Sequence, residues 1–198
     1  ETGAGLEIDN EYIMSPKDLC TISFLDKIIE AGVTVLKIEG RARAPEYVKV
    51  VTESYNEALN MIADGTYSFE KAKALEEKLK TVFNRGFWDG YYLGQSMGEW
   101  TDRYGSSATK TKEYVGKITH YYPNINIAVA LVESSVLAVD DEILITGTTT
   151  GAYTSKINEI RIDDKIVNSA TKGEIISFQV NSQVRQNDKL YKIVNSGR

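Results

Sequence analysis

The spacing of hydrophobic and polar residues changes partway along the chain. In residues 1–83 apolar side chains recur at steps of three and four, which is typical of helices that bury one face, whereas from residue 113 onward they alternate. Between these parts, residues 84–112 are rich in glycine and aromatic residues and follow no clean period. The pattern predicts an α/β part, a linker that packs its rings against its neighbours, and an all-β part in residues 113–198.

The first part is predicted to contain two βα units. Strands are expected at Tyr12–Met14 and at residues 33–38, and the second is apolar and β-branched at nearly every position, as in parallel strands buried on both faces. Capping and periodicity predict helices that begin at Ser15 and that span Ser23–Ala31, Pro45–Ala63 and Phe69–Phe83. Because two such units cannot close a sheet, we expect them to be the tail of a larger βα array.

The last part is predicted to be a small antiparallel barrel or sandwich. Short alternating segments follow one another closely, with Gly, Asn and Asp between them. The expected strands lie within residues 113–122, 124–132, 141–147, 155–162, 174–180 and 188–194.

Composition excludes some classes of partner. The 198 residues carry a formal net charge of −5, so a strongly basic surface of the kind that binds nucleic acid is not indicated, although a local basic patch stays open. No apolar run approaches the length of a membrane span, and we expect no membrane partner. Cys20 is the single cysteine and cannot form an internal disulfide, which fits a cytoplasmic location; secretion stays open as the alternative.

Two residue types that often carry catalysis occur once each. His120 lies in an alternating segment beside Tyr121, where a surface or packing role is the favoured interpretation. We expect neither a Ser-His-Asp triad nor a zinc site with two histidines within this chain. Cys20 is interpreted as a buried small residue, with a thiolate favoured by a helix start as the alternative.

The residues that follow 33–38 read "EGRAR" and are unusually charged. They have two interpretations. If residues 33–38 form a parallel strand, Glu39, Arg41 and Arg43 lie at its carboxyl edge, where βα barrels place their active sites. The arginines would there suit an anionic or carboxylate group. Alternatively, Glu39 pairs with Arg41, Arg43 or Lys37 and only fixes the loop. The residues alone leave both interpretations open.

Three short motifs resemble the collagenase-like peptidase family U32, of unknown catalytic type. They are "KDLC" at residues 17–20, "KIEGR" at residues 37–41 and "NRGF" at residues 84–87, and the resemblance covers most of residues 11–95. It implies that the first part forms the last units of a truncated TIM-like barrel. The small β-barrel that follows would resemble the second domain of translation elongation factors. The chain would then be the C-terminal part of a longer protein, inactive on its own, with the N-terminal barrel portion as its partner.

The resemblance also implies roles for individual residues of the intact protein. Glu39 and Arg41 become candidates for catalysis, and Cys20 becomes the candidate fourth ligand of an iron–sulfur cluster whose other cysteines lie outside this chain. We expect no cofactor in this chain by itself. Substrate binding is assigned to Lys37, Arg43, Asn84 and Arg85.

The family's functions are divided, so the resemblance leaves the reaction open. Many members are called peptidases or collagenases, and others act in oxygen-independent hydroxylation of RNA bases or of a quinone precursor. The first function predicts a collagen-like or other protein substrate, and the second predicts prephenate-dependent hydroxylation of tRNA. A third possibility is that the β-barrel is a module that binds RNA or protein. An exposed apolar sheet edge would also favour a homo-oligomer.

Overall fold

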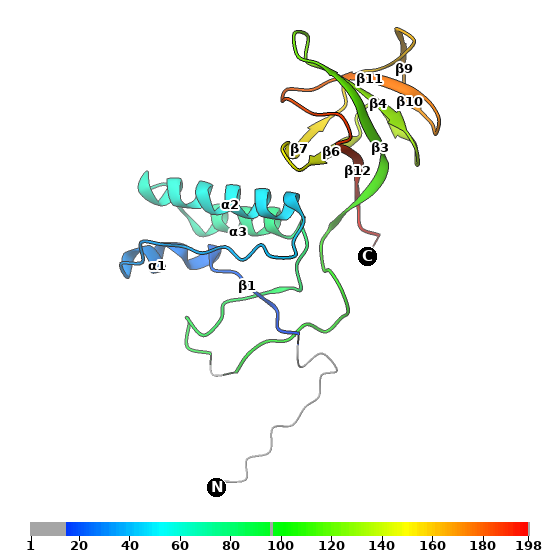
Figure 1. Ribbon diagram of the computed structural model, residues 1–198. Coiled ribbons are helices and arrows are strands. Elements are labelled where there is room, and N and C mark those ends of the chain that lie inside the picture. Colours follow the sequence, from blue (N-terminus) through cyan, green and yellow to red (C-terminus); the bar gives the residue numbers. More distant parts are fainter. Residues whose placement is uncertain (1–14, 96, 198) are drawn as a thin grey trace. The chain divides into compact units, whose positions relative to one another are not determined.

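The computed structural model describes residues 15–95 and 97–197 (Figure 1). The predicted strand at Tyr12–Met14 lies outside these residues. The chain divides into two compact units, one with residues up to 43 and residues 50–109, and the other with residues 44–49 and 110 onward. None of the helices in the described residues has both the length and the apolar character needed to cross a bilayer.

The first unit is mainly helical. Its elements are β1 (Asp18–Leu19), the 3-10 helix η1 (Ile22–Phe24), α1 (Leu25–Glu30), α2 (Pro45–Ala63) from residue 50 onward, α3 (Phe69–Leu79) and β2 (Phe87–Trp88). The predicted helix at Pro45–Ala63 is confirmed with the same bounds, and it buries Val51 and Ala58 on its apolar face. The predicted helix at Ser23–Ala31 is found as η1 running into α1, which ends before Gly32 at a positive φ of 88°.

Helix α3 begins as predicted and ends early. The Ser68 hydroxyl caps it by accepting a hydrogen bond from the Lys71 N–H at 3.3 Å. The helix was expected to reach Phe83, but it ends at Leu79. The reason lies in the next turn, where the Thr81 hydroxyl donates to the Lys78 carbonyl at 2.7 Å and so competes with continuation of the helix.

The segment that begins at Ser15 forms a strand, so the predicted helix there is wrong. Strand β1 pairs in parallel with β2, and the Cys20 N–H extends this contact by donating to the Trp88 carbonyl at 3.0 Å. Pro16 forms a β-bridge with Trp100. A serine followed by a proline is a local helix signal, and here it is overridden by partners that lie far along the chain.

Residues 33–38 run as an extended chain between α1 and α2 (Figure 1), but they form no strand. Val33 and Val35 are 41% and 80% exposed. A strand is stabilised by hydrogen bonds to a neighbouring strand, and no described residue supplies that neighbour. The prediction of a strand buried on both faces is therefore wrong for this chain. The truncated TIM-like barrel is not confirmed, because parallel pairing among the described residues is limited to β1 and β2.

The second unit contains a large antiparallel sheet, as the alternating pattern predicted. Eight strands are hydrogen-bonded in the order β7-β6-β12-β3-β4-β11-β8-β9, and β5 pairs with β10 separately. The end strands β7 and β9 are not paired with each other within the described residues, so closure into an elongation-factor-like barrel stays a prediction. The strand bounds are β3 Lys110–Tyr122, β4 Ile127–Val132, β5 Leu137–Ala138, β6 Glu142–Gly147, β7 Gly151–Lys156, β8 Ile160–Ile162, β9 Lys165–Val167, β10 Ser169–Ala170, β11 Ile175–Gln179 and β12 Lys189–Asn195.

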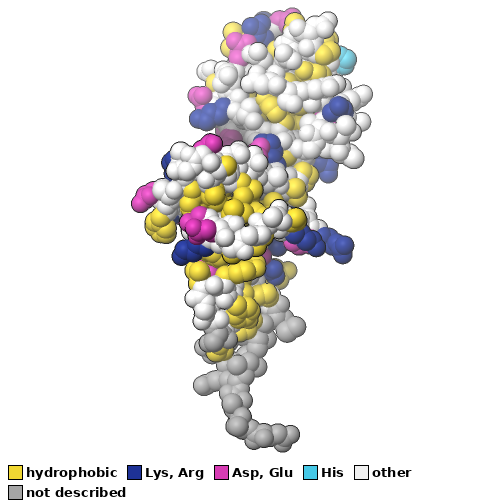
Figure 2. Space-filling model, turned by 90° about the vertical axis from the view of Figure 1, so that its left-hand side faces the viewer, with side chains coloured by type: hydrophobic (Ala, Val, Ile, Leu, Met, Phe, Trp, Pro, Cys, Tyr) yellow, Lys and Arg dark blue, Asp and Glu magenta, His cyan; other side chains and the backbone are white. Residues whose placement is uncertain are grey.

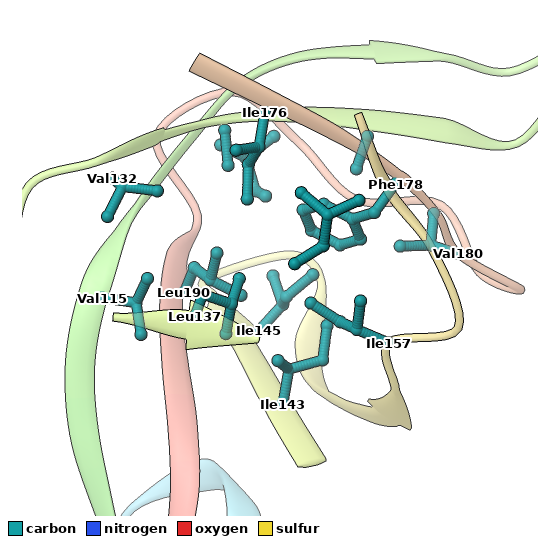
Figure 3. Packing of buried hydrophobic residues seen from close by; sticks show 14 of the residues in the cluster. Val115, Val132, Leu137, Ile143, Ile145, Ile157, Ile176, Phe178, Val180 and Leu190 are labelled. Atoms are coloured by element: carbon teal, nitrogen blue, oxygen red, sulfur yellow. The ribbon is translucent and has the colours of Figure 1, made fainter. Parts of the chain in front are cut away.

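One hydrophobic cluster lies against the buried face of this sheet (Figure 3). Strand β4 shows why the alternating pattern folds this way, because Ala128, Ala130 and Val132 are fully buried while the residues between them are partly exposed. The same period places Ile143 and Ile145 of β6 in the cluster.

A buried carboxylate stabilises the connection between β6 and β12. Asp188 is 6% exposed, and its Oδ2 accepts hydrogen bonds from the Thr150 hydroxyl at 2.6 Å and the Arg185 N–H at 2.8 Å. Gly147 lies so close to this carboxylate that a Cβ at that position would overlap Oδ1. The glycine is therefore required by the approach of the Asp188 side chain.

The substitution Gly147→Ala is expected to lower the free energy of unfolding by about 1–3 kcal/mol, because the added methyl group displaces the Asp188 carboxylate from its donors. Urea denaturation of the second unit's sheet, followed by circular dichroism, measures this change. Gly197→Ala is the matched control, since nothing lies within 4 Å of its Cβ position. Equal stability of the two variants would contradict this account of Gly147.

Candidate functional site

The turn between residues 33–38 and α2 is organised by Glu39. Its Oε1 accepts a hydrogen bond from the backbone N–H of Arg41 at 2.7 Å, and the Arg43 N–H donates to the Gly40 carbonyl at 3.0 Å. Ala42 has a positive φ of 58°, which completes the reversal before Pro45. The predicted local role of Glu39 is thus present, although it bonds the backbone of Arg41. The side chains of Glu39 and Arg41 are exposed, so the turn does not bury their charges.

Asp18 joins two of the predicted binding residues. Its Oδ1 accepts from Arg85 Nη2 at 3.1 Å and Nε at 3.3 Å, and its Oδ2 accepts from the Arg85 backbone N–H at 3.0 Å. Arg43 Nη2 lies 3.6 Å from the same Oδ1. The side chains of this Asp18 cluster (Asp18, Arg43 and Arg85) are half-buried, at 20%, 22% and 34% exposure, so solvent screens them less than a surface pair.

Arg43 is also held by an aromatic ring. Its guanidinium carbon lies 4.1 Å from the centroid of Phe83, within the range of a cation–π interaction. The ring and the Asp18 carboxylate together fix the position of the planar guanidinium. Guanidinium groups bind carboxylates and phosphates through paired N–H donors, so the Asp18 cluster is chemically suited to an anionic ligand.

The structure does not bring every predicted residue to this cluster. Asn84 is buried, and its amide bonds only nearby backbone groups: Nδ2 donates to the Val82 carbonyl at 2.9 Å, and Oδ1 accepts from the Gly86 N–H at 3.1 Å. Lys37 is exposed, and no ion pair joins it to Asp18 within the described residues. A substrate contact for Asn84 and Lys37 stays a prediction.

Cys20 lies in the interior of the first unit. It is 6% exposed, and burial raises the pKa of its thiol above the ordinary value of 9.0. The Tyr55 hydroxyl nearby accepts from the Thr21 N–H at 3.0 Å, and burial raises the pKa of Tyr55 to about 12. The interpretation of Cys20 as a buried residue is confirmed.

This chain alone does not fit an iron–sulfur cluster. Such clusters are held by four thiolates, and the sequence has one cysteine. Nor do the described residues contain any group of three or more His, Cys, Asp or Glu side chains that could hold a metal ion. A cluster in the intact protein would need its other ligands from outside this chain.

His120 shows no arrangement for catalysis. It is exposed on β3, and its ring meets the ring of Tyr122 edge-on with centroids 4.4 Å apart. The predicted surface role of His120 is therefore confirmed.

Sequence reasoning missed the residues that hold the candidate site in place. Asp18 and Phe83 fix the arginines, and the Tyr55 hydroxyl bonds Thr21, the residue after Cys20. Asp18 stands inside the "KDLC" motif, which was a signal, but its partner Arg85 lies 67 residues away. The parallel pairing of β1 with β2 brings Arg85 close to Asp18, and the hydrogen bonds between them show that the two residues meet.

The substitution Asp18→Ala is expected to lower the free energy of unfolding by about 1–3 kcal/mol, because it leaves half-buried arginine donors without their acceptor. Thermal and urea unfolding measure the change. Asp102→Ala is the matched control, because it removes the ion pair between Asp102 and Arg103. The Asp102 side chain is 81% exposed. Asp102→Ala should leave stability unchanged. A similar loss in both variants would show that the Asp18 cluster has no special structural role.

Native Cys20 is expected to resist alkylation by iodoacetamide at neutral pH and above the ordinary thiol pKa, whereas the urea-unfolded chain reacts with the pH dependence of an ordinary thiol. Because the folded pKa is raised, the unfolded chain loses this proton first. The contribution to stability is thus complete below the ordinary thiol pKa and falls as pH rises above it. Rapid native alkylation at neutral pH, followed by mass spectrometry, would contradict the burial of the thiol.

The sequence of this chain is similar to those of known proteins. The family model described as peptidase family U32 matches residues 1–102. A protein of Porphyromonas gingivalis (strain W83) named collagenase is 54% identical over 97% of this chain and 46% of its own length. The tRNA hydroxylation protein P1 of Bacillus subtilis is 27% identical over 94% of this chain and 44% of its own length.

A solved structure was also compared with this chain. The C-terminal domain of a U32-family protein from Geobacillus thermoleovorans aligns with 40% of this chain. The alignment covers 91% of that domain's own chain, at 22% identity and a TM-score of 0.39. A superposition at that level does not establish a shared fold. The chain spans about half the length of the curated relatives that it matches. Because the family model matches more than half of its residues, the chain belongs to peptidase family U32.

Proposed function

We propose that this chain forms the substrate-binding half of a collagenase-like U32 protein and does not cleave protein on its own. The observation that carries the proposal is the 54% identity, over 97% of the chain, to a protein named collagenase. Because the chain spans 46% of that relative, the remaining half of the length is available for the chemistry that this chain lacks.

The nucleophile and base candidates of this chain support the second part of the proposal. Cys20 is buried with a raised pKa, and a protonated thiol in the interior is a poor nucleophile. His120 is exposed, and its ring packs edge-on against Tyr122. Neither residue is placed as a peptidase would require.

The binding role is assigned to two surfaces, each within one unit. In the first unit, the Asp18 cluster and the exposed side chains of Glu39 and Arg41 offer charged groups to a polypeptide. In the second unit, the end strand β9 and the neighbouring segments expose apolar residues, among them Ile166 at 63%. Unpaired strand edges with apolar side chains bind extended peptides by adding a strand.

A gelatin assay tests both parts of the proposal. The purified chain should bind immobilised gelatin and leave fluorescein-labelled gelatin intact, because it carries the binding surfaces without the catalytic residues. A surface coated with serum albumin controls for non-specific adsorption. Cleavage of gelatin by the chain alone would refute its inactivity, and equal retention on gelatin and albumin would refute the binding role.

A second candidate function is the binding of tRNA in a hydroxylation enzyme. The observation that favours it is the similarity over 94% of this chain to a tRNA hydroxylation protein. In that enzyme Arg43 and Arg85 would bind a carboxylate or phosphate, and Cys20 would supply one thiolate to an iron–sulfur cluster completed by the rest of the protein. The buried thiol would have to lose its proton for that role.

Titration of the chain with tRNA at two salt concentrations tests the second function. Phosphate contacts release counterions, so the affinity should fall steeply as salt rises. The double variant Arg43→Gln/Arg85→Gln should weaken tRNA binding if the Asp18 cluster contacts the phosphates, and Arg103→Gln, at an exposed pair, is the matched control. Binding to gelatin without binding to tRNA would leave the collagenase-like function as the better account.

A further inference from the structure

Aromatic rings stay exposed in the last segment of the first unit, a unit whose surface shows open hydrophobic side chains (Figure 2). Tyr91 and Tyr104 are 63% and 87% exposed, and Tyr92 and Met97 are exposed as well. When large apolar side chains gather on a surface in this way, they often mark a place where a ligand or a partner binds. The segment lies outside both binding surfaces assigned above.

Two tryptophans join Tyr91 in one aromatic patch, defined here as Trp88, Tyr91 and Trp100. The Trp88 and Tyr91 rings meet edge-on, with centroids 5.2 Å apart. A Cβ at Gly98 would lie 3.4 Å from the Tyr91 hydroxyl and 3.6 Å from the Trp100 ring. Because Gly98 has no side chain, the backbone between these two aromatic residues stays accessible to a ligand.

Backbone pairing holds the two tryptophans of the aromatic patch in place. Trp88 belongs to β2, which pairs in parallel with β1. Trp100 forms the β-bridge with Pro16, and the Lys17 N–H donates to the Glu99 carbonyl at 3.0 Å beside this bridge. Rings that are already fixed lose little conformational entropy when a ligand binds, so the aromatic patch is preorganised.

The polar atoms of the aromatic patch are open to a ligand. Within residues 15–95 and 97–197, no hydrogen bond is made by the indole N–H of Trp88, the indole N–H of Trp100 or the Tyr91 hydroxyl. Both indole nitrogens reach solvent, because the buried side-chain atoms without a partner in this part of the chain belong to Glu46 and Ser155. Trp and Tyr donors usually find an acceptor when they are covered, so a ligand on the patch has to supply acceptors.

The charges beside the aromatic patch favour an uncharged ligand. Lys17 Nζ lies 2.6 Å from Glu99 Oε2, and Arg103 Nε lies 3.1 Å from Asp102 Oδ1. Both cations are thus paired with carboxylates, whereas phosphate groups are bound by lysines and arginines that are available to them. The patch therefore offers ring faces and neutral donors, which suit a ligand with apolar rings and free carbonyl oxygens.

We propose that the aromatic patch binds a proline-rich segment in the polyproline II conformation. Such a segment has no internal hydrogen bonds, so its carbonyl oxygens are free to accept from the two indoles and from the Tyr91 hydroxyl. Its proline rings pack on aromatic side chains, and its stiffness lowers the entropy lost on binding. Collagen chains are rich in this conformation. The inference rests on the proposed function in one respect, namely that this chain binds a polypeptide, and it names the class of segment.

Intrinsic tryptophan fluorescence tests the proposal directly. The chain has two tryptophans, and both belong to the aromatic patch, so their emission reports on this surface alone. Titration of the full 198-residue chain with a decaproline peptide should shift the emission to shorter wavelength in a saturable way, because the ligand removes the indoles from water. A glycine–serine peptide of the same length has no rings and should leave the emission unchanged.

Two variants locate the binding surface. Tyr91→Ala should weaken decaproline binding by about fivefold or more, because it removes both a ring and a donor from the patch. Gly98→Leu keeps every ring and donor but fills the space between Tyr91 and Trp100, and it should weaken binding as well. Tyr104→Ala is the matched control, since Tyr104 is an exposed tyrosine of the same unit outside the patch, and it should bind like the unmodified chain. Unfolding curves should show that all three variants fold.

Several outcomes would overturn the inference. They are an emission that decaproline does not change, an equal response to the glycine–serine peptide, and undiminished binding by folded Tyr91→Ala. Quenching by oligouridylate without a response to decaproline would assign the patch to RNA, and an emission that depends only on the concentration of the chain would assign it to a second copy; either result also overturns the inference.

The gelatin assay separates this inference from the proposed function. Retention on gelatin without a response to decaproline would refute the aromatic patch as the site and leave the proposed function standing. A response to decaproline without retention on gelatin would refute the binding part of the proposed function alone.

Discussion

The first unit depends on the hydrogen bonds and the ion pair that the Asp18 carboxylate makes. This carboxylate accepts hydrogen bonds from both the side chain and the backbone of Arg85, and it lies 3.6 Å from Arg43. Arg85 precedes β2, Arg43 precedes α2, and Asp18 itself belongs to β1, so one half-buried acid links three segments that are distant in sequence. The cation–π contact of Arg43 with Phe83 links the segment that follows α3 to the same cluster. Charged hydrogen bonds of this kind are directional, so the cluster constrains geometry as well as adding stability.

Local signals predicted the helices well, because each signal acts within a few residues. The Pro45–Ala63 helix and the Ser68 cap follow from apolar periodicity and from capping chemistry alone. The alternating pattern after residue 113 likewise predicted a large antiparallel sheet, since the buried face selects every second residue. The strand order could not be predicted in this way, because β12 lies between β3 and β6 through pairings between distant parts of the chain.

Predictions failed where the outcome depends on a distant partner. The signal at Ser15 and Pro16 favours a helix, yet β2 and Trp100 hold this segment as a strand. Conversely, residues 33–38 have strong strand propensity, and no strand among residues 15–95 and 97–197 pairs with them. The site shows the same division. Glu39 makes its contact within its own turn, to the backbone of Arg41, whereas the convergence of Arg43 and Arg85 requires Asp18, whose role is visible only in three dimensions.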